Sequence, residues 1–135
     1  MDEDEDYLAE VRDARGRARA CAILVAIDGD GSIVGCVSYL PDPGGPMSEV
    51  ARDGEAEFRM HGVLPERRGA GVGRALAEAC IERARASGRS GIVLSTPPEW
   101  TVGQRLYERL GFVRAPERDH EPVEGVLLWA YALPL

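Results

Sequence analysis

The sequence predicts one α/β domain built around a mixed β-sheet, and three observations lead to this fold class. Two nearly continuous apolar runs, at 21–27 and 33–40, flank a short Asp/Gly turn and predict a β-hairpin. Residues 57–95 read as a strand, a glycine-rich turn, a helix and a second strand, which is the pattern of a right-handed parallel crossover. The 135 residues suit a single hydrophobic core and contain no linker or internal repeat, so we assign 1–135 to one domain.

The composition is that of an ordinary soluble globular protein, with 44% hydrophobic and 29% charged residues. No apolar run is long enough to span a membrane and no signal peptide is recognisable, so we expect a cytoplasmic protein without a membrane partner. Much of the formal net charge of −7 comes from the acidic residues 2–6, and the basic footprint of a nucleic-acid-binding protein is missing. The cysteines lack metal-ligand spacing, so we expect no metal site and buried free thiols at Cys21, Cys36 and Cys80.

The first predicted element is a helix over about residues 6–15. Tyr7, Leu8 and Val11 can share one helical face, and the acidic residues 2–6 suit a helix N-terminus. We therefore expect a helix ahead of the hairpin.

The hairpin strands are expected at 21–27 and 33–40, with the turn at 28–31 between them. The following segment, 41–54, is rich in Pro, Gly and Asp and is expected to be a loop. A loop of this length is as consistent with a contact to substrate as with a simple connection.

The next predicted strand, 55–63, alternates along its length. One side carries Phe58, Met60 and Gly62, and the other carries Glu57, Arg59, His61 and Val63. Gly62 permits a β-bulge, which would break this alternation.

A glycine-rich run, residues 69–73, leads from this strand into a helix predicted over about 74–87. Glycines let the backbone approach a ligand closely, the first N–H groups of a helix lack partners within it, and the helix dipole favours negative charge there. The junction therefore predicts an anion-binding site. The apolar stripe of the helix consists of Val72, Leu76, Cys80 and Ala84, with Ala75 and Ala79 beside it, and Gly88 is expected to end the helix.

Two familiar phosphate loops do not match this run. The P-loop requires Gly-Lys-Ser/Thr, whereas the chain has Gly73-Arg74-Ala75. The dinucleotide fingerprint requires a third glycine at the position that Arg74 occupies. The nearby Arg67, Arg68 and Arg74 can be read as a phosphate clamp or as solvated surface charges.

A buried strand over 91–95 is expected to complete the crossover. Residues 96–99, Thr-Pro-Pro-Glu, then read as a capping box with proline at the first helical position. The helix is expected to end at Leu110, before Gly111, and its apolar face consists of Trp100, Gly103, Tyr107 and Leu110. The chain is expected to close with a strand from Phe112, a polar turn over 119–125 and a last strand over 126–133.

Two motifs together resemble a known family. Residues 68–73, Arg-Gly-Ala-Gly-Val-Gly, match the pattern Arg/Gln-x-x-Gly-x-Gly/Ala and follow Val63-Leu64-Pro65. Residues 105–112, Arg-Leu-Tyr-Glu-Arg-Leu-Gly-Phe, are similar to the late helix and following strand of the same proteins. Over about 6–133 the chain resembles the GCN5-related N-acetyltransferases (the GNAT family).

The resemblance implies a mixed, mostly antiparallel sheet with a central splayed parallel strand pair and flanking helices. It also implies acetyl-coenzyme A (acetyl-CoA) as co-substrate, with the pantetheine arm in the gap between the splayed strands. Val63 would offer a backbone partner to that arm. The pyrophosphate would bind at Arg68 and at the amides of Gly69, Gly71, Val72, Gly73 and Arg74.

The same resemblance suggests catalytic roles for three residues. Tyr107 resembles the family tyrosine that protonates the leaving thiolate, although a core tyrosine would look the same in the sequence. Glu57 resembles a glutamate that acts as base, often through water, and an ion-paired strand carboxylate is the alternative. His61 is a second candidate base, or else a partly buried structural histidine.

The chain departs from the family pattern in two places. The family's N-terminal strand and first helix are expected to be missing, which would leave a sheet edge unpaired and favour a homodimer. Trp100 stands where many members carry an asparagine, so one contact to the coenzyme is expected to differ.

We therefore expect an N-acetyltransferase that moves an acetyl group directly to a small-molecule or peptide amine in a ternary complex. A non-catalytic acyl-CoA-binding sensor or interaction module is the alternative.

Overall fold

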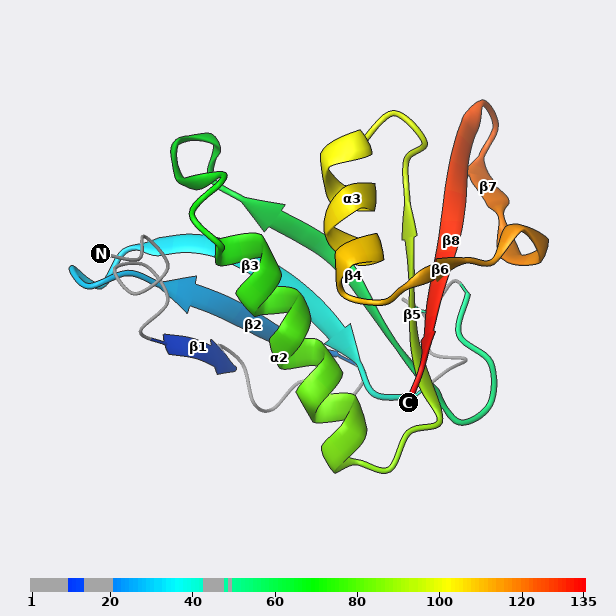
Figure 1. The fold of residues 1–135 in the computed structure, drawn as a ribbon, viewed down its shortest axis with the longest axis horizontal. Coiled ribbons are helices and arrows are strands. Elements are labelled where there is room, and N and C mark those ends of the chain that lie inside the picture. The colour runs from blue at the N-terminus through cyan, green and yellow to red at the C-terminus, as the bar shows by residue number, and fades with distance from the viewer. Residues whose placement is uncertain (1–9, 14–20, 43–47, 49) are drawn as a thin grey trace.

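Eight strands and two α-helices form the part of the chain that the computed structural model describes, namely residues 10–13, 21–42, 48 and 50–135 (Figure 1). The strands are β1 (Glu10–Asp13), β2 (Ala22–Ile27), β3 (Ile33–Leu40), β4 (Glu55–Val63), β5 (Gly91–Thr96), β6 (Val113–Arg114), β7 (His120–Val123) and β8 (Val126–Pro134). The helices are α2 (Val72–Ala86) and α3 (Thr101–Arg109), with short 3₁₀ turns η1 (Pro65–Arg67) and η2 (Pro116–Arg118).

The strands lie in the order β1-β2-β3-β4-β5-β8-β6, and β7 pairs with β8. β4 and β5 are parallel, while the other neighbouring strands are antiparallel. This arrangement confirms the predicted mixed, mostly antiparallel sheet. The hairpin of β2 and β3 is confirmed too, and the Asp28 carboxylate closes its turn by accepting the N–H groups of Asp30 and Ser32.

The N-terminal prediction is wrong where the structure describes it. Residues 10–13 form the strand β1, which pairs antiparallel with β2, instead of part of a helix. A strand therefore does precede the hairpin, which corrects the expectation that an N-terminal strand is missing. The remainder of the predicted helix and the question of a first helix fall on 1–9 and 14–20, outside the described residues.

The central parallel pair separates after a short contact. Glu55, Ala56 and Glu57 pair with Gly91, Ile92 and Val93, and the register ends there although both strands continue. The predicted splay is therefore confirmed, and it leaves a gap between the C-terminal parts of β4 and β5.

A β-bulge lies in β4 beside this gap. Arg59 pairs with Ser38 and Gly62 pairs with Cys36, so three steps along β4 match two along β3. The bulge that Gly62 was expected to permit is thus present, and the simple alternation fails. As a consequence, the ring of His61 contacts the ring of Phe58, with 5.7 Å between their centroids.

Helix α2 crosses β2, β3 and β4 on one face of the sheet, as Figure 1 shows. It begins two residues earlier than predicted, at Val72, after Gly71 in the left-handed conformation (φ +88°). Its predicted stripe is buried, and Gly88 (φ +71°) follows its end as expected. The main core lies between α2, α3 and this face, and a smaller cluster on the other face contains Val50, Val93, Ala115 and Ala130.

Helix α3 starts later than the predicted capping box. Thr96 still belongs to β5, the helix begins at Thr101, and no side chain caps it. Instead, the side-chain amide of Gln104 donates to the carbonyl oxygens of Pro97 and Pro98. The two prolines therefore form the turn before the helix, and Gly111 (φ +101°) follows its end as expected.

Smaller predictions had mixed outcomes. The polar turn expected over 119–125 contains the strand β7, paired to β8, so that prediction is wrong. The three cysteines are free thiols, and Cys21 and Cys80 are buried, but Cys36 is exposed. Within the described ranges, no helix is long and apolar enough to cross a membrane, and no cluster of His, Cys, Asp or Glu side chains could hold a metal ion.

Candidate active site

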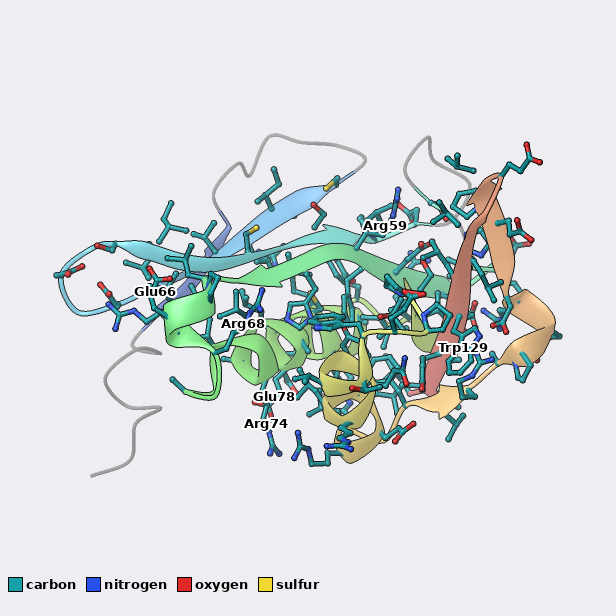
Figure 2. The ribbon with its side chains drawn as sticks, turned by 90° about the horizontal axis from the view of Figure 1, so that it is seen from above. Arg59, Glu66, Arg68, Arg74, Glu78 and Trp129 are labelled. Carbon is teal, nitrogen blue, oxygen red and sulfur yellow. The ribbon has the colours of Figure 1, made fainter. Side chains whose placement is uncertain are left out.

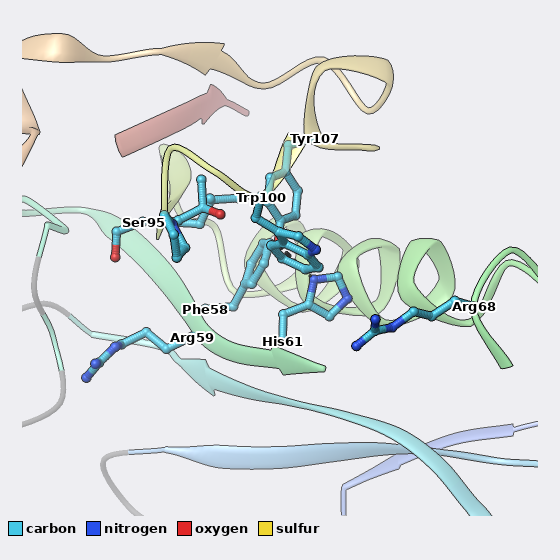
Figure 3. Close-up of a pocket in the computed structure, with 10 residues that line it drawn as sticks. Phe58, Arg59, His61, Arg68, Ser95, Trp100 and Tyr107 are labelled. Carbon is cyan, nitrogen blue, oxygen red and sulfur yellow. Dashed lines mark hydrogen bonds between the residues drawn. The ribbon is translucent and has the colours of Figure 1, made fainter. Parts of the chain in front are cut away.

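A cavity of about 350 Å³ opens where β4 and β5 separate. Its lining comes from β4, β5, the turn after β5, α3 and the glycine loop, and consists of Phe58, Arg59, His61, Arg68, Leu94, Ser95, Thr96, Pro97, Trp100 and Tyr107. In the close-up of Figure 3, Arg59 and Arg68 lie at opposite ends of this group, with His61 between them. A cationic side chain therefore stands at each end of the cavity lining.

His61 and Tyr107 form the polar centre of the cavity. The Tyr107 hydroxyl lies 2.9 Å from Nδ1 of His61, and Nε2 of His61 lies 2.9 Å from the carbonyl oxygen of Gly73. A carbonyl oxygen only accepts, so Nε2 carries the ring proton and donates it to Gly73. Nδ1 then has a lone pair, and the Tyr107 hydroxyl donates to it.

Burial shifts the pKa of both groups. Desolvation lowers the pKa of His61 from 6.5 to about 4, although the hydrogen bond to Gly73 opposes the shift. Desolvation also raises the pKa of the Tyr107 hydroxyl well above its ordinary value. At neutral pH the cavity therefore contains a neutral imidazole beside a neutral phenol.

Aromatic rings hold this pair in place. Trp100, at the start of α3, presents its ring edge-on to His61 and to Tyr107, with centroids 6.4 and 6.2 Å away. A Cβ atom on Gly103 would lie 2.4 Å from Trp100 Cε3, so the glycine makes room for the indole. Trp100 thus lines the cavity, at the position where the family resemblance led us to expect an asparagine.

The glycine loop lies at the Arg68 end of the cavity. Gly69 (φ +87°) and Gly71 (φ +88°) adopt left-handed backbone conformations that disfavour other residues. The first i to i−4 hydrogen bond of α2 runs from the N–H of Ala75 to the carbonyl oxygen of Gly71. Gly71, the N-cap residue, has no side chain that could accept from the N–H groups in between. The amides of Val72, Gly73 and Arg74 are therefore the terminal donors of α2, as an anion site requires.

The three arginines near this loop differ in their surroundings. Arg68 lines the cavity and donates from Nε to the carbonyl of Val63 at 3.4 Å, while Arg74 pairs with Glu78 on the exposed face of α2. Figure 2 shows Arg74 and Glu78 together on that face. Arg67 instead pairs with Asp28 of the hairpin turn at 3.0 Å. Of the three, only Arg68 lines the cavity.

Glu57 lies apart from the pair of His61 and Tyr107. It is fully buried, and its Oε1 accepts hydrogen bonds from the Ser48 hydroxyl (2.9 Å), the Val50 amide (3.3 Å) and the Ala51 amide (3.2 Å). It does not line the cavity, whereas its neighbours Phe58 and Arg59 do. The structure therefore brings together His61, Tyr107 and Arg68, while Glu57 anchors the loop before β4.

Three polar residues of the cavity lining were not predicted from the sequence as site residues, namely Arg59, Ser95 and Thr96. Thr96 was assigned to a helix cap, yet its buried hydroxyl has no hydrogen-bond partner among the described residues. Such a hydroxyl in a cavity wall can bond to a ligand. The signal available in the sequence was the apolar run 91–96, which ends in the two hydroxyl residues Ser95 and Thr96.

Comparison with known proteins identifies the family. The sequence profile of the Acetyltransferase (GNAT) family matches residues 1–112. The chain belongs to the GNAT family. It is 33% identical over 105 residues to an uncharacterized N-acetyltransferase of Schizosaccharomyces pombe, covering 78% of this chain and 60% of the relative. It is also 36% identical over 91 residues to the mycothiol acetyltransferase of Arthrobacter sp., covering 67% of this chain and 27% of the relative. The chain thus spans less than two thirds of the length of these GNAT relatives.

Solved structures agree with this assignment. A GCN5-related N-acetyltransferase from Kribbella flavida superposes with a TM-score of 0.67 at 31% identity, covering 88% of this chain and 70% of that one. The NatC complex bound to Gag peptide and CoA contains a chain with a TM-score of 0.69 at 24% identity, covering 84% and 70%. At 24% identity, the match to the NatC chain supports a shared fold and nothing further. The GNAT fold expected from the sequence is confirmed.

Proposed function

We propose that this GNAT protein transfers the acetyl group of acetyl-CoA directly to an amine within a ternary complex. The observation that carries the proposal is the cavity in the strand gap, which has Arg68, the residue before the glycine run, at one end and Tyr107 at its centre. Such a transfer requires donors for a pyrophosphate, an extended channel and a proton donor for the leaving thiolate. Each of these has a counterpart among the described residues.

The cofactor end of the site is the end with Arg68. The terminal amides of α2 and those of Gly69 and Gly71 would hold the pyrophosphate, with Arg68 at the start of the loop. The backbone of β4 up to Val63 would pair with the pantetheine arm, because β4 has no partner in β5 beyond Glu57. The orphaned hydroxyl of Thr96 gives the arm one more polar contact.

Tyr107 is the proposed acid for the thiolate, and its single phenolic proton, which it donates to Nδ1 of His61 in this structure, would have to turn toward the sulfur. Its raised pKa keeps the hydroxyl protonated at neutral pH, and it lines the cavity where the arm would end. His61 is a poor base, since its pKa is about 4 and both its nitrogens are engaged. Of the two candidate bases, Glu57 is the one we propose, and it would act through water because it does not line the cavity.

The acceptor amine would enter from the Arg59 end of the cavity. Arg59 and Ser95 line that part and lie on the side away from Arg68 in Figure 3. A small-molecule amine is our first choice, by analogy with the mycothiol acetyltransferases, and a peptide amine is the second.

Calorimetric titration with acetyl-CoA, using ATP and NAD as controls, tests the cofactor. We expect acetyl-CoA to bind much more tightly than ATP or NAD, because only acetyl-CoA can fill both the loop and the cavity, and we expect turnover in a screen of small amines and peptides. Binding without turnover of any amine would favour the non-catalytic acyl-CoA module. A folded sample that does not bind acetyl-CoA would refute the proposal.

A further inference from the structure

A continuous chain of hydrogen bonds runs from the glycine loop to the catalytic candidate Tyr107. It starts at the Gly73 carbonyl in the first turn of α2, passes through the imidazole of His61 on β4, and ends at the Tyr107 hydroxyl on α3. Both links are 2.9 Å long. The side chain of His61 therefore joins β4, α2 and α3.

The direction of both hydrogen bonds is fixed by chemistry. Because the Gly73 carbonyl can only accept, the imidazole donates from Nε2, and the neutral ring therefore accepts at Nδ1. The phenolic proton of Tyr107 is thereby oriented toward Nδ1. The surrounding rings of Phe58 and Trp100 limit any other orientation of the imidazole.

The Gly73 carbonyl also belongs to the peptide unit whose N–H is the amide of Arg74. That amide is one of the terminal donors of α2, which would face the pyrophosphate. An anion bound at the N–H side of a peptide unit polarises it and makes its carbonyl a stronger acceptor. A stronger acceptor at Gly73 strengthens the hydrogen bond from Nε2 and shifts electron density within the imidazole toward Nδ1. Nδ1 then becomes a better acceptor for the hydrogen bond from the Tyr107 hydroxyl.

We propose that His61 is a positioning residue that couples occupancy of the glycine loop to the orientation of the Tyr107 hydroxyl. This inference rests on the proposed function, because it requires the loop to bind the pyrophosphate. It gives His61 a different role from the base suggested by its residue type. The hydrogen bond from the Tyr107 hydroxyl to Nδ1 of His61 would thus be stronger when the loop is occupied than when it is empty.

Nuclear magnetic resonance can follow the chain link by link, with ADP as the probe. ADP carries a pyrophosphate but no pantetheine arm, so it can occupy the loop without entering the cavity. The protein has two histidines and four tyrosines, so a His120→Gln variant assigns the ring nitrogens of His61, and Tyr107→Phe assigns the Cζ signal of Tyr107. We expect saturating ADP to shift the amide signals of 71–74, both ring nitrogens of His61 and the Cζ of Tyr107.

A His61→Phe variant separates coupling from a direct effect of the nearby charge. This variant keeps an aromatic ring and removes both hydrogen bonds. We expect ADP still to shift the loop amides but to leave the Tyr107 signal in place.

Three results would overturn the proposal, and they differ in what else they overturn. If ADP shifts the loop amides but not His61, or if the Tyr107 shift persists in His61→Phe, the coupling is refuted and the loop assignment stands. If neither ADP nor acetyl-CoA shifts the loop amides, the coupling and the proposed pyrophosphate site are refuted together.

Discussion

Replacing Glu57 by glutamine should destabilise the protein by about 1–3 kcal/mol. Oε1 of this fully buried side chain accepts three hydrogen bonds, from Ser48, Val50 and Ala51. A hydrogen bond to a charged acceptor contributes about 1 kcal/mol more than one to a neutral acceptor, so the three bonds set an upper value of about 3 kcal/mol. The lower desolvation cost of a buried amide offsets part of that loss.

Alanine at the same position should cost more. It removes the acceptor and leaves two backbone amides without their partner, at about 1–3 kcal/mol each, and it also creates a cavity. A total of about 3–6 kcal/mol is a large share of the stability of an ordinary domain, about 5–15 kcal/mol. Urea unfolding of the three proteins gives the free energies of unfolding for this comparison.

The matched control is Glu82→Gln, which removes an exposed carboxylate paired with Arg85 on α2. We expect a change within about 0.5 kcal/mol there. The reasoning is refuted if Glu57→Gln unfolds at the same urea concentration as the unaltered protein, or if Glu57→Ala is no less stable than Glu57→Gln. Under conditions where Glu57→Gln is folded, the proposed base role also predicts a loss of kcat of about 10²-fold or more.

Three further predictions follow from the site. Tyr107→Phe should lower kcat by about 10²-fold and leave the calorimetric affinity for acetyl-CoA intact; an unchanged kcat would remove the acid role. His61 is neutral when folded and has a pKa lowered to about 4, so the unfolded chain takes up its proton first as the pH falls below about 6.5. The free energy of unfolding should therefore fall between pH 6.5 and pH 4, and His61 should account for at most about 3 kcal/mol of that fall. The variant His61→Phe should show a flatter pH dependence in urea unfolding. Gly71→Glu should abolish acetyl-CoA binding, because its side chain would block the loop and place a negative charge there. The control is Gly125→Glu, at another left-handed glycine in the β7–β8 turn, which should bind acetyl-CoA normally. Equal binding by both variants would contradict the loop assignment.

The central elements could be predicted because their local signals agree. The strands β3 and β4 begin and end where the sequence indicates, since apolar runs and turn residues mark both ends. The two N-terminal misassignments have a different cause. Glu-Val-Arg-Asp at 10–13 is short and largely polar, and its strand conformation comes from pairing with β2, a long-range contact that a local pattern does not reveal.

The site could be predicted in part, for a similar reason. The glycine loop is a local pattern, so its anion-binding geometry can be expected from residues 69–74 alone. The contact of His61 with Tyr107 depends on the bulge in β4, which moves His61 to the face that Phe58 occupies. The anchoring role of Glu57 depends on the path of the loop at 48–51, which no periodicity describes.

The brief pairing of β4 with β5 divides the sheet into two blocks, with β1–β4 on one side and β5–β8 on the other. Only three residue pairs join the blocks along this seam, and beyond Glu57 the facing backbone of β4 has no partner in β5. An extended pantetheine arm bonded to β4 would act there as a removable ninth strand. If acetyl-CoA binds as proposed, its concentration therefore sets the rigidity of the seam, and the apparent stability of the protein rises as RT ln(1 + [L]/Kd). The cofactor would then be a structural component of the sheet as well as the source of the acetyl group.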